Sequence, residues 1–183
     1  MISRHLSICV YCGARDGTDP AYVAAATDLG TAIAAKGWRL VYGAGDVGLM
    51  GATARAAQEA GAETFGVIPT HLMDMEVGKR DLSTFVVTET MHERKKVMFM
   101  NADVIVVLPG GAGSLDEFFE VLTWKQLGLH NKPIFLLSVK DYWKPLEDLI
   151  DHIIAQGFAG PQNRDFFQVV KTVPALLAAM DHG

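Results

Sequence analysis

The chain places bare backbone, a hydroxyl group and carboxylates at one predicted strand-to-helix corner, in the stretch VLPGGAGSLDEFFE (Val107–Glu120). Pro109 is expected to end the strand, because proline has no N–H group to donate to a sheet. Gly110, Gly111 and Gly113 are expected to bend the backbone through positive φ and to bring its amides close to a ligand. These residue types predict a binding site for an anion.

The helix that follows is predicted over Ser114–Leu127, and its first turn offers unpaired N–H groups and the positive end of the helix dipole to a phosphate. Ser114 has two possible roles that its spacing does not separate. It could cap the helix, in a capping box with Glu117, or donate its hydroxyl to the phosphate. Glu117 lies one turn beyond Ser114, so both can face the same opening, whereas Asp116 is rotated by about 100° and is expected to be solvated.

A second glycine corner, in VYGAGDVGLMG, precedes a helix predicted over Leu49–Ala60. Gly43, Gly45 and Gly48 match G-x-G-x-x-G, the dinucleotide-binding pattern. The match follows the second predicted strand, and the next strand ends in VIPTH, where a ribose-binding acidic residue would be expected. A contact with a mononucleotide is therefore favoured over a dinucleotide site, and a simple packing turn remains an alternative.

Basic side chains occur on the helix predicted over Met91–Asn101, which leads into the strand that ends at Pro109. Arg94 and Lys95 could lie on a solvated helix face, or a planar guanidinium could point to the strand ends and bind a phosphate, ribose hydroxyls or a carboxylate. His92 has no second histidine at metal-ligand spacing, so no metal site is expected.

Strand-like and helical segments alternate along the whole chain, which predicts an α/β fold. The expected strands are HLSICVYC, WRLVYG, ETFGVIP, STFVVTE, DVIVVLP, PIFLLS and FFQVV. The remaining helices are expected over Ala21–Lys36, Lys144–Gln156 and Val173–Met180. The central strands are continuously apolar, as burial on both faces requires. We therefore expect one Rossmann-like domain, residues 1–183, with three α/β/α layers around a mainly parallel sheet of about seven strands.

Composition narrows the possible functions. The chain has 183 residues, half of them apolar, and a net charge of −5, which gives no electrostatic footprint for nucleic acid. No apolar stretch approaches the roughly 20 residues that span a bilayer, and the start lacks the pattern of a signal peptide, so a cytoplasmic protein without a membrane partner is expected. Cys9 and Cys12 would lie about 10 Å apart on a strand, too far for a disulfide, and are expected to be thiols in or near the core.

Two motifs, MHERKKVM and PGGAGSLDE, resemble the hallmarks M-H-x-R-K and P-G-G-x-G-T-x-x-E of the Lonely Guy (LOG) family. YGAGDVGLMG, VYCGAR and WKQLGLHNKPI extend the resemblance over nearly the whole chain. It implies hydrolysis of the N-glycosidic bond of adenine-type nucleoside 5′-monophosphates, either cytokinin riboside 5′-monophosphates or AMP, to the free base and ribose 5-phosphate. It also implies a homodimer. No cofactor is expected; the label of lysine decarboxylase given to some relatives is discounted, because this single domain shows no pyridoxal-phosphate site.

The resemblance also implies roles for individual residues. Arg94 and Glu117 match the family's catalytic pair. The residues implied to bind the substrate or its phosphate are Gly43, Gly45, Glu76, Lys95, Gly110, Gly111, Gly113, Ser114 and Thr123. Two departures from the family pattern occur. Ser114 replaces a threonine, and GAGD replaces a run of three glycines, which adds the methyl group of Ala44 and the charge of Asp46 near the expected phosphate site.

The residue types fit the implied chemistry. Cleavage of a ribosyl C–N bond builds positive charge on the sugar, which the carboxylate of Glu117 could stabilise, and the same group could activate water. Arg94 is expected to orient Glu117 and the sugar phosphate. The alternative is a carrier that binds a nucleotide or cofactor on the same fold without cleaving it. The Arg94–Glu117 pair favours the enzyme, because a carrier has no need of both.

Overall fold

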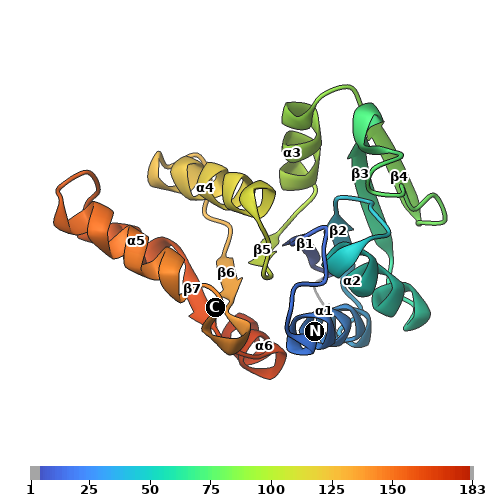
Figure 1. Ribbon diagram of the computed structural model, residues 1–183, viewed down its shortest axis with the longest axis horizontal. Helices are drawn as coiled ribbons and strands as arrows, with labels where there is room; N and C mark the ends of the chain where they lie inside the picture. The colour runs from blue at the N-terminus through green and yellow to red at the C-terminus, as the bar shows by residue number, and fades with distance from the viewer. Residues whose placement is uncertain (1–4, 182–183) are drawn as a thin grey trace.

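The computed structural model describes residues 5–181, so the two ends of the expected domain, residues 1–4 and 182–183, lie outside it. Its seven strands form one parallel sheet in the order β4-β3-β2-β1-β5-β6-β7, with helices on both sides (Figure 1). The strands are β1 (Ser7–Tyr11), β2 (Arg39–Tyr42), β3 (Thr64–Pro69), β4 (Thr84–Thr88), β5 (Val104–Val107), β6 (Ile134–Leu137) and β7 (Gln168–Val170). The helices are α1 (Pro20–Ala35), α2 (Gly48–Glu59), α3 (Met91–Met100), α4 (Ala112–Gln126), α5 (Lys144–Ala155) and α6 (Val173–Asp181). The predicted α/β architecture is confirmed.

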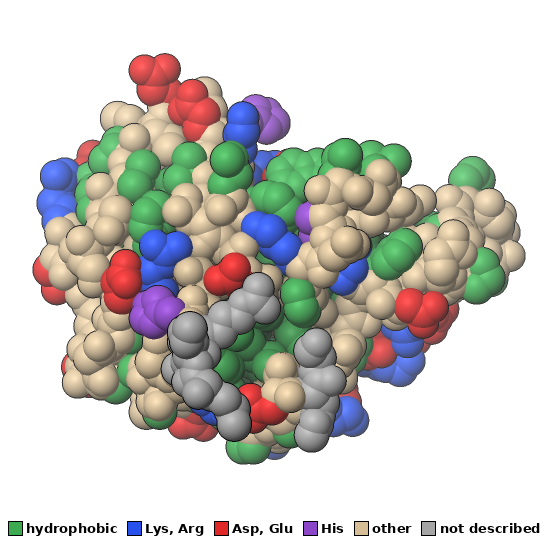
Figure 2. Space-filling model, turned by 180° about the vertical axis from the view of Figure 1, so that it is seen from behind, with side chains coloured by type: hydrophobic (Ala, Val, Ile, Leu, Met, Phe, Trp, Pro, Cys, Tyr) green, Lys and Arg blue, Asp and Glu red, His purple; other side chains and the backbone are tan. Residues whose placement is uncertain are grey.

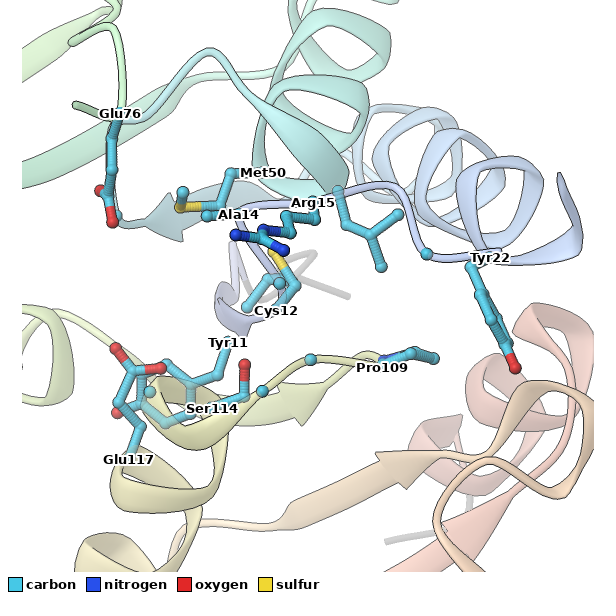
Figure 3. A pocket seen from close by; sticks show the side chains of 18 of the residues that line it. Tyr11, Cys12, Ala14, Arg15, Tyr22, Met50, Glu76, Pro109, Ser114 and Glu117 are labelled. Carbon is cyan, nitrogen blue, oxygen red and sulfur yellow. The ribbon is translucent and has the colours of Figure 1, made fainter. Parts of the chain in front are cut away.

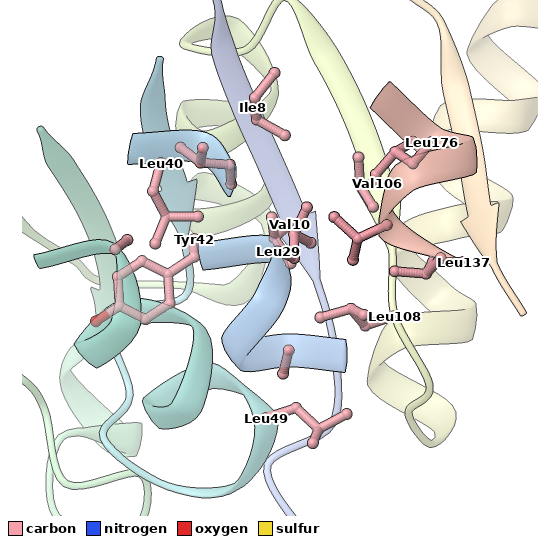
Figure 4. Close-up of a cluster of buried hydrophobic side chains, with 14 of the residues drawn as sticks. Ile8, Val10, Leu29, Leu40, Tyr42, Leu49, Val106, Leu108, Leu137 and Leu176 are labelled. Atoms are coloured by element: carbon pink, nitrogen blue, oxygen red, sulfur yellow. The ribbon is translucent and has the colours of Figure 1, made fainter. Parts of the chain in front are cut away.

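Alternate residues of the central strands pack against opposite helix layers. Ile8 and Val10 of β1 belong to the core cluster that includes residues of α1, α2 and α6, part of which is shown in Figure 4. Cys9 and Tyr11 belong to the cluster on the other face, with residues of α3, α4 and α5. Every residue of β1, β5 and β6 is buried, which explains why these strands read as continuous apolar runs.

The strand order reverses between β1 and β5. The chain adds β2, β3 and β4 on one side of β1 and then returns, so that β5 pairs with β1 on the other side, from Ile8–Val104 to Tyr11–Val107. At such a switch point the connections after the two strands run to opposite sides of the sheet and leave a crevice outside its carboxyl edge. The crevice therefore lies between the β1–α1 and β5–α4 connections.

The helices differ in how their first N–H groups are satisfied. Asp19 caps α1 by accepting a hydrogen bond from the Ala21 N–H at 2.8 Å, and Thr90 and Glu93 form a reciprocal capping box at the start of α3. The N-cap residues of α2 and α4 are Val47 and Gly111, and neither supplies a side-chain cap. Both helices that begin at the glycine corners therefore start without a side-chain cap, as does α5 after Trp143.

Both cysteines are free thiols, as the sequence predicted, with Cys9 buried and Cys12 partly buried. Burial raises the pKa of both thiols well above the usual value, which keeps them protonated and weakly nucleophilic. Within residues 5–181, no helix combines the length and the apolar character that crossing a bilayer requires.

Close packing of α1 on α2 depends on the missing side chain of Gly30. A Cβ atom at this position would overlap the carbonyl oxygen of Thr53 and would lie 3.0 Å from both Ala56 Cβ and Ala57 N. Two of these three atoms belong to the backbone of α2. The overlap can therefore be relieved only by moving one helix away from the other.

We expect Gly30→Ala to lower the free energy of unfolding by about 1–3 kcal/mol through overpacking. This loss would occur although alanine is the better helix former by about 1 kcal/mol. Urea unfolding followed by circular dichroism measures the change. Thr31→Ala, at the exposed neighbouring position of α1, is the matched control and should change the stability by no more than about 0.5 kcal/mol. A Gly30→Ala protein as stable as its parent would contradict this account of the packing.

Candidate active site

The start of α4 differs from the sequence prediction. The helix begins at Ala112, with Gly111 as its N-cap residue, so Ser114 is the third helical residue and does not cap the helix. Its side-chain oxygen is buried and has no hydrogen-bond partner among the described residues, and the whole residue is only 3% exposed. Of the two roles left open for Ser114, the cap is therefore wrong, and its hydroxyl remains free for a ligand.

The glycines of this corner provide space rather than unusual backbone angles. The expectation that Gly110, Gly111 and Gly113 adopt positive φ is wrong, since none of them is among the glycines with positive φ. A Cβ at Gly110 would overlap Ser114 Oγ and lie 2.9 Å from Gly13 N, so this position is filled by the neighbouring loop. Around Gly111 and Gly113 there is open space within 4 Å of an added Cβ. The first amides of α4 are thus left uncovered by side chains.

A cavity of about 490 Å³ lies at the carboxyl ends of β1 and β5, where the strand order reverses (Figure 3). This volume is within the usual range of small-molecule sites, about 300–1,000 Å³. The structure brings eight of the predicted site residues together in its wall: Gly43, Glu76, Arg94, Gly110, Gly111, Gly113, Ser114 and Glu117. Gly45, Lys95 and Thr123 do not line it.

Arg94 is buried and holds three segments together. Its Nη2 donates to Glu76 Oε2 at 2.8 Å and to the Gly43 carbonyl oxygen at 2.6 Å, and its Nε donates to the Val67 carbonyl oxygen at 3.0 Å. A Cβ at Gly43 would overlap the guanidinium, so glycine is required there. Arg94 was expected to orient Glu117, but none of these hydrogen bonds reaches Glu117. In the structure Arg94 instead fixes Glu76 and the first glycine corner.

The first glycine corner contributes less to the cavity than predicted. Gly43 lines it, whereas Gly45 forms an isolated backbone bridge with Gly78 of the long loop that joins β3 to β4 (residues 70–83). Ala44 has a left-handed φ of 57° and is fully buried. Asp46 forms an ion pair with Arg55 outside the cavity, so its charge is offset there rather than placed beside a ligand. The corner mainly anchors the loop that carries Glu76.

Lys95 is buried and does not line the cavity, but forms ion pairs with two carboxylates of α4. Its Nζ lies 3.0 Å from Asp116 Oδ2 and 2.8 Å from Glu120 Oε2, both on α4. This arrangement joins α3 to α4, and it pairs Asp116, which was expected to be merely solvated. Thr123 is exposed further along α4. In this single chain neither Lys95 nor Thr123 contacts the space where a ligand would bind.

Glu117 is recessed in the wall of the cavity, and burial raises its pKa from 4.5 to about 8. The nearby charges act in both directions: Arg94 and Lys95 lower the pKa, whereas Asp116 and Glu76 raise it. Burial has the largest effect. A carboxyl group whose pKa lies near neutrality and which faces a cavity is suited to proton transfer.

The far end of the cavity is formed by residues that were not predicted from the sequence. Tyr142 Oη donates to the Gly110 carbonyl oxygen at 2.6 Å, and its ring meets Tyr22 edge to face, with ring centroids 5.5 Å apart. Arg15 and Met50 also line the cavity (Figure 3). Tyr22 and Tyr142 lie in no recognisable motif, and only their proximity in the fold reveals them. Arg15 follows directly after the β1 exit and could have been suspected from that position.

The fold and the cavity together define a doubly wound α/β protein with a small-molecule crevice at its switch point. A family model described as "Possible lysine decarboxylase" matches residues 50–180. The chain is 41% identical over 165 residues to the cytokinin riboside 5′-monophosphate phosphoribohydrolase LOG5 of Arabidopsis thaliana, covering 90% of this chain and 72% of the relative. It is 42% identical over 175 residues to the cytokinin riboside 5′-monophosphate phosphoribohydrolase of Rhodococcoides fascians, covering 95% and 88%. The chain belongs to this family, the LOG family, as its motifs predicted.

Solved structures of more distant proteins share the architecture. The molybdenum cofactor binding protein of Rippkaea orientalis superposes with a TM-score of 0.72 at 20% identity and covers 98% of this chain and 97% of that one. The Moco carrier protein of Chlamydomonas reinhardtii gives a TM-score of 0.72 at 23% identity, with 98% and 97% covered. At these identities the likeness shows a common fold.

The raised pKa of Glu117 makes the folded protein less stable as the pH rises. Below pH 4.5 the group is protonated in both states. Between 4.5 and about 8 the unfolded chain releases the proton that the folded protein retains, so unfolding is favoured progressively. Glu117→Gln cannot ionise, and we expect its melting temperature to rise relative to the parent across this range and to show no such gain below it.

Thermal melts at both ends of this pH range and at one pH between them measure the difference. Glu120→Gln, one turn further along α4, is the control: it loses the ion pair with Lys95 and should show no growing advantage at high pH. A difference between Glu117→Gln and the parent that does not change with pH would show that Glu117 titrates normally.

Proposed function

We propose that the protein hydrolyses the N-glycosidic bond of adenine-type nucleoside 5′-monophosphates, giving the free base and ribose 5-phosphate. One observation carries this proposal. A recessed carboxyl group, Glu117, lies in the same cavity as the uncapped start of α4 and the unpaired hydroxyl of Ser114. The names of the relatives, cytokinin riboside 5′-monophosphate phosphoribohydrolases at about 40% identity, support the same activity.

The substrate's 5′-phosphate binds at the start of α4. The uncovered amides from Gly111 to Ser114 and the Ser114 hydroxyl donate hydrogen bonds to its oxygens, and the helix dipole adds about 0.3–1 kcal/mol. Glu117 follows one helical turn later, so a ribose attached to this phosphate lies with its anomeric carbon toward the carboxyl group. The phosphate thus positions the sugar, and Glu117 acts on it.

Hydrolysis transfers the bonding electrons of the C–N bond to the base and adds water oxygen to the anomeric carbon. In its ionised form Glu117 stabilises the positive charge that develops on the sugar and takes a proton from the attacking water. Because its pKa lies near neutrality, the same group can return that proton to the departing base. The overall reaction then needs no cofactor.

The base end of the cavity is formed by the loop that carries Glu76, the residue proposed to contact the base. Arg94 fixes the carboxylate of Glu76, and Leu72, Met91 and Met98 add apolar surface to the same cavity. Apolar and flexible methionine side chains accommodate a flat purine and also a purine that carries a prenyl group. This supports adenine-type bases as a class, including those of cytokinin nucleotides.

The alternative, a carrier that binds without cleavage, has weaker support. The Moco-binding proteins resemble this chain at only 20–23% identity, whereas the named hydrolases reach about 40%. The Arg94–Glu117 pair no longer separates the two functions, because Arg94 bonds to Glu76 instead. Glu117 alone does so, since a recessed acidic group adds no favourable charge to an anion site and is explained by catalysis.

We also propose that the protein is a cytoplasmic homodimer. Two free thiols fit a reducing compartment. Figure 2 shows hydrophobic side chains along the upper edge of the molecule, and Met100, Leu127 and Leu129 are 66–69% exposed around the ends of α3 and α4. A second copy could bury this surface. Light scattering on the purified protein tests the assembly, and a mass of one chain would refute the dimer.

We expect the purified protein to release the free base from AMP and from isopentenyl-AMP, and Glu117→Gln to lower kcat by about 10²–10⁴-fold because it cannot exchange a proton. Chromatography of the released base measures turnover, and calorimetry shows that the variant still binds AMP. A carrier would bind AMP without releasing base in either protein.

Asp116→Asn is the matched control for this experiment. It makes the same carboxyl-to-amide change one residue earlier on α4, at a side chain that is 59% exposed and outside the cavity. Its turnover should stay close to that of the parent. If folded Glu117→Gln keeps substantial turnover, the assigned role of Glu117 fails.

A further inference from the structure

The cavity contains little positive charge for a doubly charged ligand. Arg15 and Arg94 are the cationic residues that line it among the described residues. Arg94 is 5% exposed and its charge is offset by the carboxylate of Glu76 at 2.8 Å. Asp16 and Glu117 add acidic groups to the same wall. Without Arg15, the side chains around the ligand would therefore carry no uncompensated positive charge.

A phosphate monoester needs more positive charge than the helix provides. It carries about −1.5 to −2 charges at neutral pH, whereas the start of a helix is equivalent to about half a positive charge. The uncovered amides of α4 can therefore fix the position of the phosphate but do not neutralise it. A cation on another part of the wall is required for tight binding.

Arg15 is an exposed arginine whose side chain forms no hydrogen bond or ion pair with any residue in the described range 5–181. Figure 3 shows its guanidinium extended into the cavity beside Cys12 and Met50, on the side opposite Pro109 and Ser114. An unpaired guanidinium in a cavity has its donors free for a ligand, and its planar shape suits two phosphate oxygens at once.

The backbone that carries Arg15 is held firmly between the two glycine corners. Gly13 N donates to the Pro109 carbonyl oxygen at 3.0 Å, and Leu49 N donates to the Gly13 carbonyl oxygen at 3.1 Å. A Cβ at Gly48 would overlap the backbone of Ala14 and Arg15, so the start of α2 packs directly on this segment. The long side chain therefore extends from a fixed point close to the start of α4.

We propose that Arg15 binds the 5′-phosphate from the side opposite the amides of α4, and that it makes the site selective for nucleoside monophosphates over nucleosides. This inference rests on the proposed function, because it assigns the phosphate to the start of α4. The phosphate is enclosed between fixed backbone donors and the unpaired guanidinium of Arg15. Arg15 acts in binding, and the chemical step remains with Glu117.

The test compares Arg15→Gln with the parent, using AMP, ribose 5-phosphate and adenosine as probes. Loss of a charged hydrogen-bonding partner should weaken the binding of AMP and ribose 5-phosphate about 10- to 100-fold in calorimetry. It should raise KM for AMP by a similar factor with little change in kcat, and leave the affinity for adenosine unchanged. Arg15→Lys should recover part of the loss. Arg80→Gln, which removes an exposed arginine outside the cavity, is the control for net charge.

Each outcome bears on Arg15 separately from the proposed function. Unchanged affinity of Arg15→Gln for both phosphates overturns the inference, as does an equal loss for AMP and adenosine, which would indicate a structural role. If the parent binds AMP but releases no base, the proposed hydrolysis fails, and the affinities for ribose 5-phosphate still decide the role of Arg15.

Discussion

The structure depends on one constraint, the uncapped start of α4 at the point where the strand order reverses. A helix leaves its first N–H groups without partners, and a buried helix start must find them elsewhere. In this chain Gly111 offers no side chain, and the hydroxyl of Ser114 stays unpaired. The pairing of β1 with β5 then places these donors in a crevice rather than against the core. The fold leaves the donors unsatisfied at the place where a ligand can satisfy them.

The charged residues of the site have two kinds of role: Arg94 and Lys95 hold elements of the fold together, whereas Glu117 faces the cavity. Arg94 donates its hydrogen bonds to Glu76 and to two backbone carbonyl groups. These bonds join α3, β3 and the long loop into one rigid wall. Lys95, its neighbour in sequence, pairs with Asp116 and Glu120 and joins α3 to α4. No cation among the described residues forms an ion pair with Glu117. Burial therefore raises its pKa, and Arg94 and Lys95 offset that effect only in part.

Most of the fold could be predicted from the sequence, because the spacing of apolar residues and the length of apolar runs depend directly on which residues are buried. It predicted an open glycine corner at the right residues, but partly for the wrong reason: Gly110 is required by the contact with Ser114 and not by positive φ. The partners of Arg94 and Lys95 could not be predicted, since both lie on one short helix and only tertiary placement decides which carboxylate each meets. Tyr22 and Tyr142 lie in no motif, and Arg15 ends the stretch VYCGAR, whose resemblance to the family implies no role for it. They become neighbours through the meeting of segments that are far apart along the chain.

The crevice has walls from both halves of the sheet, which meet at the β1–β5 pairing. A molecule lodged there touches Gly43 and Glu76 on one half and Ser114 and Glu117 on the other. A bound ligand therefore links the two halves of the sheet, and its binding free energy adds to the free energy of unfolding of the whole chain. The lifetime of such a protein in a cell would follow the supply of its own ligand.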